Sequence, residues 1–167
     1  MQTDPRSLVA VLRKNVRAGK KLYSAAYIMP PPKMSPELSK FERHIYLLFR
    51  EARSGLLSRL CASDTLQALY ENLRMVPSLG PFLAFQYAVD IAYSEVVSAS
   101  ESDFVVAGPG AIRGVNKCFT NRRGLTTEQV IFHMYENQEE YFRQQEICFE
   151  GLGGRPLQPV DCQNLFC

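Results

Sequence analysis

Three polar residues in the middle of this sequence are the first candidates for chemistry. Asp103 ends an acidic, serine-containing turn and directly precedes an apolar run, 104–107, and a glycine-rich helix start. A carboxylate placed there can project into a cleft and act as a general base. Gln86 and Asp90 are four residues apart, so they share one face if their segment is helical. Each of the three also has a structural interpretation, as a helix cap, a turn residue or a buried hydrogen-bonding group.

The glycine-rich run 108–114 is a candidate anion site. Its glycines leave backbone amides uncovered, and Pro109 fixes the first residue of a helix whose N-terminus attracts negative charge. Gly114 is followed by Val115, so the run is not a nucleotide-binding P-loop, which needs G-x-x-x-x-G-K-[ST]. A cradle for phosphate or pyrophosphate, continued by a basic strip, is predicted from Gly108, Gly110, Ala111, Arg113 and Lys117.

The stretch 75–84 has the pattern of two helices joined by a tight turn. It resembles the helix-hairpin-helix motif, L-P-G-x-G-x-x-x-A, whose turn amides bind a DNA phosphate without reading sequence. Gly80 fits the motif, whereas Ser78 replaces a glycine and can adopt positive φ only at a cost. Asp103 follows Ser78 by 25 residues, close to the spacing of the catalytic aspartate in helix-hairpin-helix DNA glycosylases. An ordinary helix–helix corner is the alternative.

The charge is distributed unevenly along the chain. Residues 1–60 hold 12 Lys and Arg against 4 Asp and Glu, whereas residues 61–167 hold 7 against 13. Lys20 and Lys21 continue a series of cations at helical spacing, 13–17, that can face phosphates and would give salt-dependent affinity. A solvated helix face is the alternative explanation.

Several classes of protein are disfavoured by the composition. No apolar run is long enough to span a membrane, and the first residues lack a secretory signal, so we expect an intracellular protein, cytoplasmic or, in a eukaryote, nuclear. Five scattered cysteines favour reduced thiols over a disulfide framework. Neither a paired metal-ligand motif nor a cofactor motif occurs, so we expect no metal and no cofactor.

The elements that must position these residues are helices. Apolar periodicity predicts four helices, over 7–19, 35–59, 80–91 and 126–149. A further helix is capped by Ser63 or Asp64 and ends before Pro77, and another begins at Pro109. A helical turn is predicted over 161–167. The run Pro30–Pro32 is a linker. With no convincing strand pair, residues 1–167 are predicted to form a single all-α domain.

Two longer runs, 80–94 and 103–114, resemble the thymine-hypermodification proteins. These comprise the α-glutamyl/putrescinyl-thymine pyrophosphorylases, the amino-acid:DNA transferases and the helical domain of 5-hydroxymethyluracil DNA kinases. Residues 19–23 with Ala26 and Tyr27 are similar to the opening segment of the family. The residues similar to the start of its C-terminal signature are Asp161, Gln163, Asn164 and Cys167. Family members typically continue beyond that cysteine, so the resemblance implies a shortened C-terminus.

The resemblance implies a helix-hairpin-helix, DNA glycosylase-like fold and chemistry on a 5-substituted uracil in DNA. In that chemistry an amine or amino acid displaces pyrophosphate from an activated hydroxymethyl group. Asp103 and Asp90 would then be candidate bases, Gln86 and Phe104 would contact the base, and the 108–111 run would hold pyrophosphate. The alternative is a non-catalytic DNA-binding module. The implied partners are DNA with a modified pyrimidine, an amine or amino-acid donor, and a kinase.

Overall fold

The computed structural model describes residues 4–24 and 29–167, and these residues form an all-helical fold. The all-α prediction is therefore confirmed. Within the described ranges the only extended pairing is an isolated bridge between Leu152 and Arg155. Ala26 and Tyr27 of the family's opening segment lie outside the described residues. No described helix is long and apolar enough to cross a membrane.

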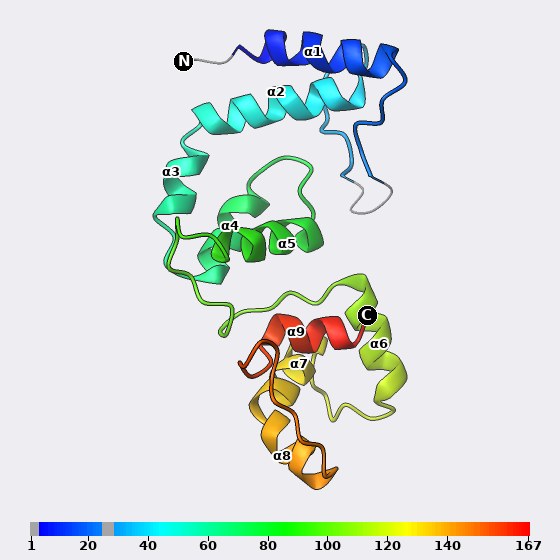
Figure 1. The fold of residues 1–167 in the computed structure, drawn as a ribbon, viewed down its shortest axis with the longest axis vertical. Helices are drawn as coiled ribbons and strands as arrows, with labels where there is room; N and C mark the ends of the chain where they lie inside the picture. The colour runs from blue at the N-terminus through cyan, green and yellow to red at the C-terminus, as the bar shows by residue number, and fades with distance from the viewer. Residues whose placement is uncertain (1–3, 25–28) are drawn as a thin grey trace.

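The N-terminal part of the fold is an antiparallel pair of helices, α1 (Pro5–Arg17) and α2 (Lys40–Arg53), shown in Figure 1. Arg13 of α1 forms an ion pair with Glu42, which is only 4% exposed. Glu42 also accepts a hydrogen bond from the Ser39 amide, so α2 begins after Ser39, where a capping box forms. The pairing with Arg13 therefore docks α1 at the start of α2.

The single helix predicted over 35–59 is wrong in its bounds. The chain leaves α2 at Ser54, turns at Gly55 with φ of 80°, and resumes as α3 (Leu56–Cys61). A left-handed residue breaks the helical hydrogen-bond ladder, and glycine adopts this conformation without steric cost. Apolar spacing continues through the break, which is why periodicity alone missed it.

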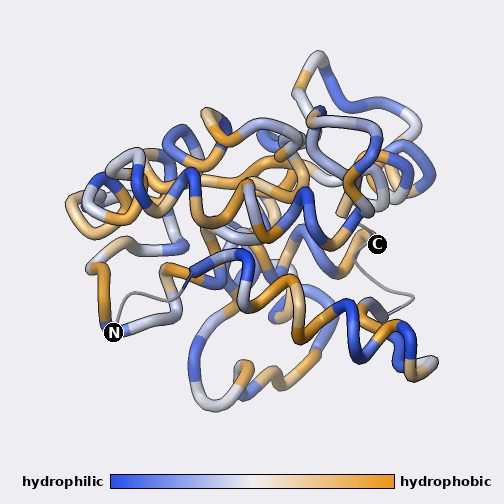
Figure 2. The backbone as a smooth tube through the Cα atoms, turned by 90° about the horizontal axis from the view of Figure 1, so that it is seen from above, coloured by the Kyte–Doolittle hydropathy of each residue, from blue (hydrophilic) through white to orange (hydrophobic). Residues whose placement is uncertain are grey.

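The centre of the core lies between α4 (Leu66–Arg74) and α5 (Pro81–Ala92). Thr65 caps α4, accepting from the Ala68 amide, so the cap predicted at Ser63 or Asp64 is wrong by one or two residues. Ser63 donates its hydroxyl to the Arg59 carbonyl instead. Figure 2 shows hydrophobic and hydrophilic stretches alternating along the helices, as expected for helices with one apolar face.

Residues 101–108 run antiparallel along α5 and close this core. At one end the Tyr93 hydroxyl donates to Glu101 (2.7 Å). In the middle the ring of Phe104 packs against Phe85, with centroids 6.1 Å apart. At the other end Gly108 lies against the ring of Phe82. The segment thereby leads the chain from the end of α5 back to its start.

The C-terminal part contains α6 (Pro109–Cys118), α7 (Thr127–Glu136), α8 (Gln138–Gln144) and α9 (Pro159–Leu165). The sequence leaves the cap of the helix predicted from residue 126 open between Thr126 and Thr127, and Thr126 forms it, in a capping box with Gln129. The helix predicted to continue to residue 149 instead breaks at Asn137. The buried Gln138 amide then bonds to the backbone of Leu157, which fixes the start of α8 beneath the loop that leads to α9.

Candidate nucleic-acid interface

The turn between α4 and α5 holds Ser78 in an unusual backbone conformation. Ser78 has φ of 75°, the left-handed region that glycine occupies most easily. A serine adopts positive φ only at a cost, which counts against a hairpin turn at this position in the sequence. Ser78 has this conformation nevertheless. The Leu79 amide donates to the Val76 carbonyl (3.2 Å) and closes the turn. The turn therefore contains one left-handed residue, Ser78, whereas the helix-hairpin-helix motif and DNA binding by this turn remain predictions.

The N-terminus of α5 is open. Gly80 is its N-cap, Pro81 follows, and no side chain caps the helix. A side chain added at Gly80 would meet no atom within 4 Å. Among the described residues, none accepts a hydrogen bond from the amides of Phe82 and Leu83. Free amides at a helix N-terminus attract anions.

The N-terminus of α6 lies next to that of α5. A Cβ atom added at Gly108, the N-cap of α6, would lie 2.9 Å from the ring of Phe82 in the first turn of α5. Like α5, α6 has a glycine N-cap, a proline at its first position, and neither a side-chain cap nor an acidic residue in its first turn. Figure 1 shows the two helix starts on the same side of the molecule.

The glycines of α6 have packing roles. A Cβ at Gly110 would lie 2.9 Å from Cys167 Sγ, and one at Gly114 would lie 1.8 Å from the Phe166 carbonyl oxygen. The side chain of Ala111 is fully buried. The chain after α9 therefore approaches α6 this closely only because positions 110 and 114 are glycine, whether or not an anion binds. The phosphate cradle at 108–111 remains a prediction.

Four predicted DNA-binding cations are exposed. Arg113 and Lys117 project from α6, and Lys20 and Lys21 follow α1. In the described part of the chain none of the four forms an ion pair with a carboxylate, unlike Arg13. They therefore keep their full charge for an external anion.

Asp103 is exposed and lacks a hydrogen-bond partner in the described structure. Glu101, two residues earlier, does have partners: its carboxylate accepts a hydrogen bond from the Tyr93 hydroxyl and lies 3.5 Å from the Arg155 guanidinium. Arg155 also forms an ion pair with Asp161 (2.7 Å). Burial of the Tyr93 hydroxyl is the main cause that raises the pKa of Tyr93 to about 12, and the hydrogen bond to Glu101 is the second. Tyr93 and Glu101 of this network line a cavity of about 370 Å³. Sequence reasoning missed it because its members come from three separate segments.

Gln86 and Asp90 project from α5, as predicted from their spacing. Gln86 shares a face with Phe82 and Tyr93, the residues that contact the two ends of segment 101–108. Asp90 is exposed beside Tyr87 and contributes, after burial, to raising the pKa of that tyrosine. Gln86 therefore borders the segment that carries Asp103.

Phe104 has its ring in the core. It packs against Tyr70, with centroids 5.3 Å apart, as well as against Phe85. The contact with Tyr70 is tilted and the contact with Phe85 is edge-on. Phe104 therefore has a packing role, and its contact with a base remains a prediction.

The predicted C-terminal signature packs onto α6 and α7. Asp161 accepts from Arg155 and from the Gln158 amide. Gln163 is 1% exposed, and its side-chain oxygen has no hydrogen-bond partner among residues 4–24 and 29–167. The Cys167 thiol donates to the Gln163 carbonyl (3.7 Å), whereas Asn164 is exposed. All five cysteines are free thiols. The signature thus anchors α9, and a functional role for its residues remains a prediction.

Comparison with known proteins supports the resemblance found in the sequence. Searches of curated proteins and of solved structures found no match. The family model described as "5-hmdU DNA kinase, helical domain" matches residues 1–167. Because this match spans both helix starts, segment 101–108 and the C-terminal signature, the chain belongs to the family of 5-hmdU DNA kinase helical domains.

Proposed function

We propose that this chain binds DNA that carries 5-hydroxymethyluracil or its activated derivatives, and presents it for modification. The contact between Gly108 and Phe82 carries the proposal, because it sets side by side two helix N-termini that, in the described structure, have neither a side-chain cap nor an acidic residue in their own first turn. A nearby carboxylate, Glu128, accepts from the Ala107 amide just before α6. Each N-terminus attracts one phosphate through free amides and the helix dipole. Two adjacent N-termini suit two neighbouring phosphates of one backbone.

The exposed cations extend this interface. Arg113 and Lys117 lie one and two turns into α6, where they can meet phosphates that flank those at the helix starts. Contacts to phosphates give affinity with little sequence readout and strong salt dependence. We assign the phosphorylation step itself to a partner kinase.

A matched pair of substitutions at Gly80 tests the proposal. Asp and Asn both cap helices well, and the position has room for a side chain, so Gly80→Asp and Gly80→Asn should fold alike. Only the aspartate places a negative charge where a phosphate is expected. Fluorescence anisotropy with duplex DNA containing 5-hydroxymethyluracil should show binding by Gly80→Asp at least tenfold weaker than by Gly80→Asn. Equal affinities would refute the role of the α5 N-terminus.

Salt dependence tests the cations separately. Replacing Arg113 and Lys117 by glutamine should lower the slope of log affinity against log salt by ~2, since each phosphate contact contributes about 0.9. Arg50→Gln with Arg53→Gln removes the same charge from the far end of α2 and serves as the control. An equal change in the control would mean that net charge, and not this interface, sets the affinity.

A second candidate function is displacement of pyrophosphate by an amine on the modified base. The observation that favours it is the exposed, unpartnered Asp103 on the segment that borders Gln86. In this reaction the bond from the base methylene to pyrophosphate oxygen breaks, a carbon–nitrogen bond forms, and the carboxylate takes the proton that the amine loses. Pyrophosphate release from DNA carrying the activated base should fall ~100-fold in Asp103→Asn. Full activity would move the assignment to Asp90.

A further inference from the structure

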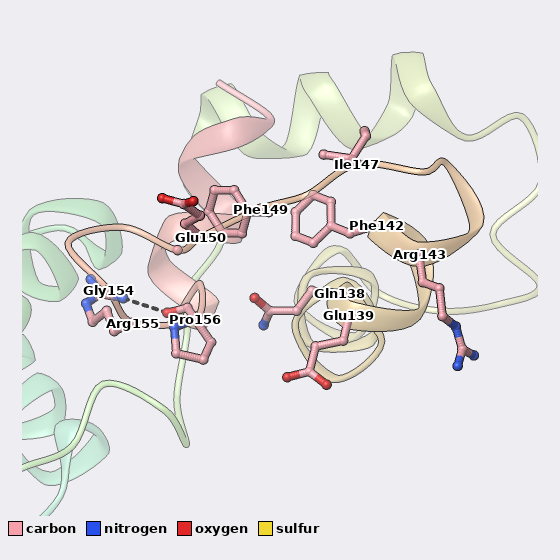
Figure 3. A pocket seen from close by; sticks show the side chains of 11 residues that line it. Gln138, Glu139, Phe142, Arg143, Ile147, Phe149, Glu150, Gly154, Arg155 and Pro156 are labelled. Carbon is pink, nitrogen blue, oxygen red and sulfur yellow. Dashed lines mark hydrogen bonds between the residues drawn. The ribbon is translucent and has the colours of Figure 1, made fainter.

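The end of the molecule formed by α8 and residues 145–156 exposes large apolar side chains around a cavity of about 430 Å³ (Figure 3). Phe142 and Phe149 line it, with ring centroids 4.8 Å apart. Ile147 and Phe149, which both line the cavity, are 53% and 38% exposed. Exposed apolar side chains that are contiguous in this way mark binding surfaces more often than isolated ones do.

The free charges around this cavity are negative. Arg143 is neutralised by Glu140, and Arg155 by Asp161 and Glu101. In the described structure Glu139 and Glu150, which also line the cavity, have no partner. The surrounding residues 128–150 contain six glutamates and one arginine. A nucleic acid would be repelled here, whereas a cationic partner would be attracted.

The position of this surface is also informative. Figure 1 shows α8 at one end of the longest axis of the molecule and α1, in the basic part of the sequence, at the other. The α5 and α6 N-termini lie between them. DNA held at the two helix starts therefore leaves the α8 end available to another molecule.

We propose that this cavity docks a segment of a partner protein in which an aliphatic side chain is flanked by lysines or arginines. The aliphatic group enters beside Phe142 and Phe149, and the cations meet Glu139 and Glu150. Phe142, Ile147 and Phe149 together line the cavity, so its apolar part fits the aliphatic side chain of a peptide segment better than a small amine. This surface is separate from the proposed DNA interface.

Two labelled peptides test the docking surface, one alternating lysine with leucine and the other glutamate with leucine. By fluorescence anisotropy the lysine peptide should bind, and Glu139→Gln with Glu150→Gln should weaken it about tenfold. Phe149→Ala should weaken it by a similar factor at unchanged salt dependence. The control, Glu37→Gln with Glu95→Gln, removes equal charge from exposed sites elsewhere and should leave binding within twofold.

Several outcomes would overturn the proposal. Equal binding of both peptides would show that charge complementarity is absent. An equal loss in the control variant would show attraction by net charge alone. Competition by putrescine at the same concentration as the unlabelled lysine peptide would assign the cavity to a small organic cation. Urea unfolding of each variant separates a lost contact from a lost fold.

Discussion

Replacing Gly114 by alanine should destabilise the fold, although alanine is the better helix former. The new Cβ would lie 1.8 Å from the Phe166 carbonyl oxygen and 2.7 Å from its carbon, where ordinary contact begins at 3.4 Å. The obstacle is backbone, so the end of α9 must move away. That movement also disturbs the packing of Phe166 against Phe119, whose ring centroids are 6.0 Å apart.

The size of the effect follows from two opposing contributions. Overpacking of this kind costs about 1–3 kcal/mol, and disturbance of the Phe166 ring places it near the upper limit. The gain in helix propensity returns about 1 kcal/mol. The net loss of about 2 kcal/mol corresponds to a fall in Tm of about 4–8 °C for a chain of this length.

Urea unfolding followed by circular dichroism measures this loss as a lower midpoint at unchanged slope. Gly110→Ala is the matched control in the same helix, because its Cβ would meet first the Cys167 thiol, the end of a side chain that can rotate away. The control should lose less than ~1 kcal/mol. A Gly114→Ala protein as stable as the parent would refute the close approach of residue 166 to α6.

Three further predictions concern single residues. Ser78→Gly should raise the free energy of unfolding by about 1 kcal/mol, because glycine removes the cost of the left-handed conformation; a lower urea midpoint would contradict this. The Tyr93 pKa of about 12 lies above its value of 10 in the unfolded chain, so the folded protein holds this proton more tightly and its stability should fall as pH rises from 10 to 12. Glu101→Gln should lower the Tyr93 pKa, measured by absorbance titration with Tyr93→Phe as the reference. Burial raises the pKa of Cys162 to about 11, so at pH 8 Ellman's reagent should modify the four exposed cysteines quickly and Cys162 only after unfolding.

Helix starts could be predicted from the sequence wherever local chemistry determines them. Gly-Pro pairs begin α5 and α6, and Thr126 with Gln129 begins α7, because caps depend on residues within one turn. The breaks at Gly55 and Asn137 could not be predicted from periodicity. The second is fixed by the bonds of Gln138 to Leu157, a partner 19 residues away.

The candidate site could be predicted from the sequence only where its features depend on residues close together in the chain. The exposure of Arg113 and Lys117 follows from their place on α6, a local property. The contact of Gly108 with Phe82 joins residues that no local pattern relates. Glu101 and Asp103 look alike in the sequence, and only Tyr93 and Arg155 distinguish them in space.

The close contact between α6 and the end of α9 also bears on how the chain folds during synthesis. The pairs α1 with α2 and α4 with α5 are neighbours in sequence, so they can form as soon as each pair has left the ribosome. Helix α6, by contrast, keeps its glycine face uncovered until residues 166 and 167 arrive. Until then, a chaperone that recognises incompletely packed surfaces should bind nascent chains on the α6–α8 region and release them once α9 docks.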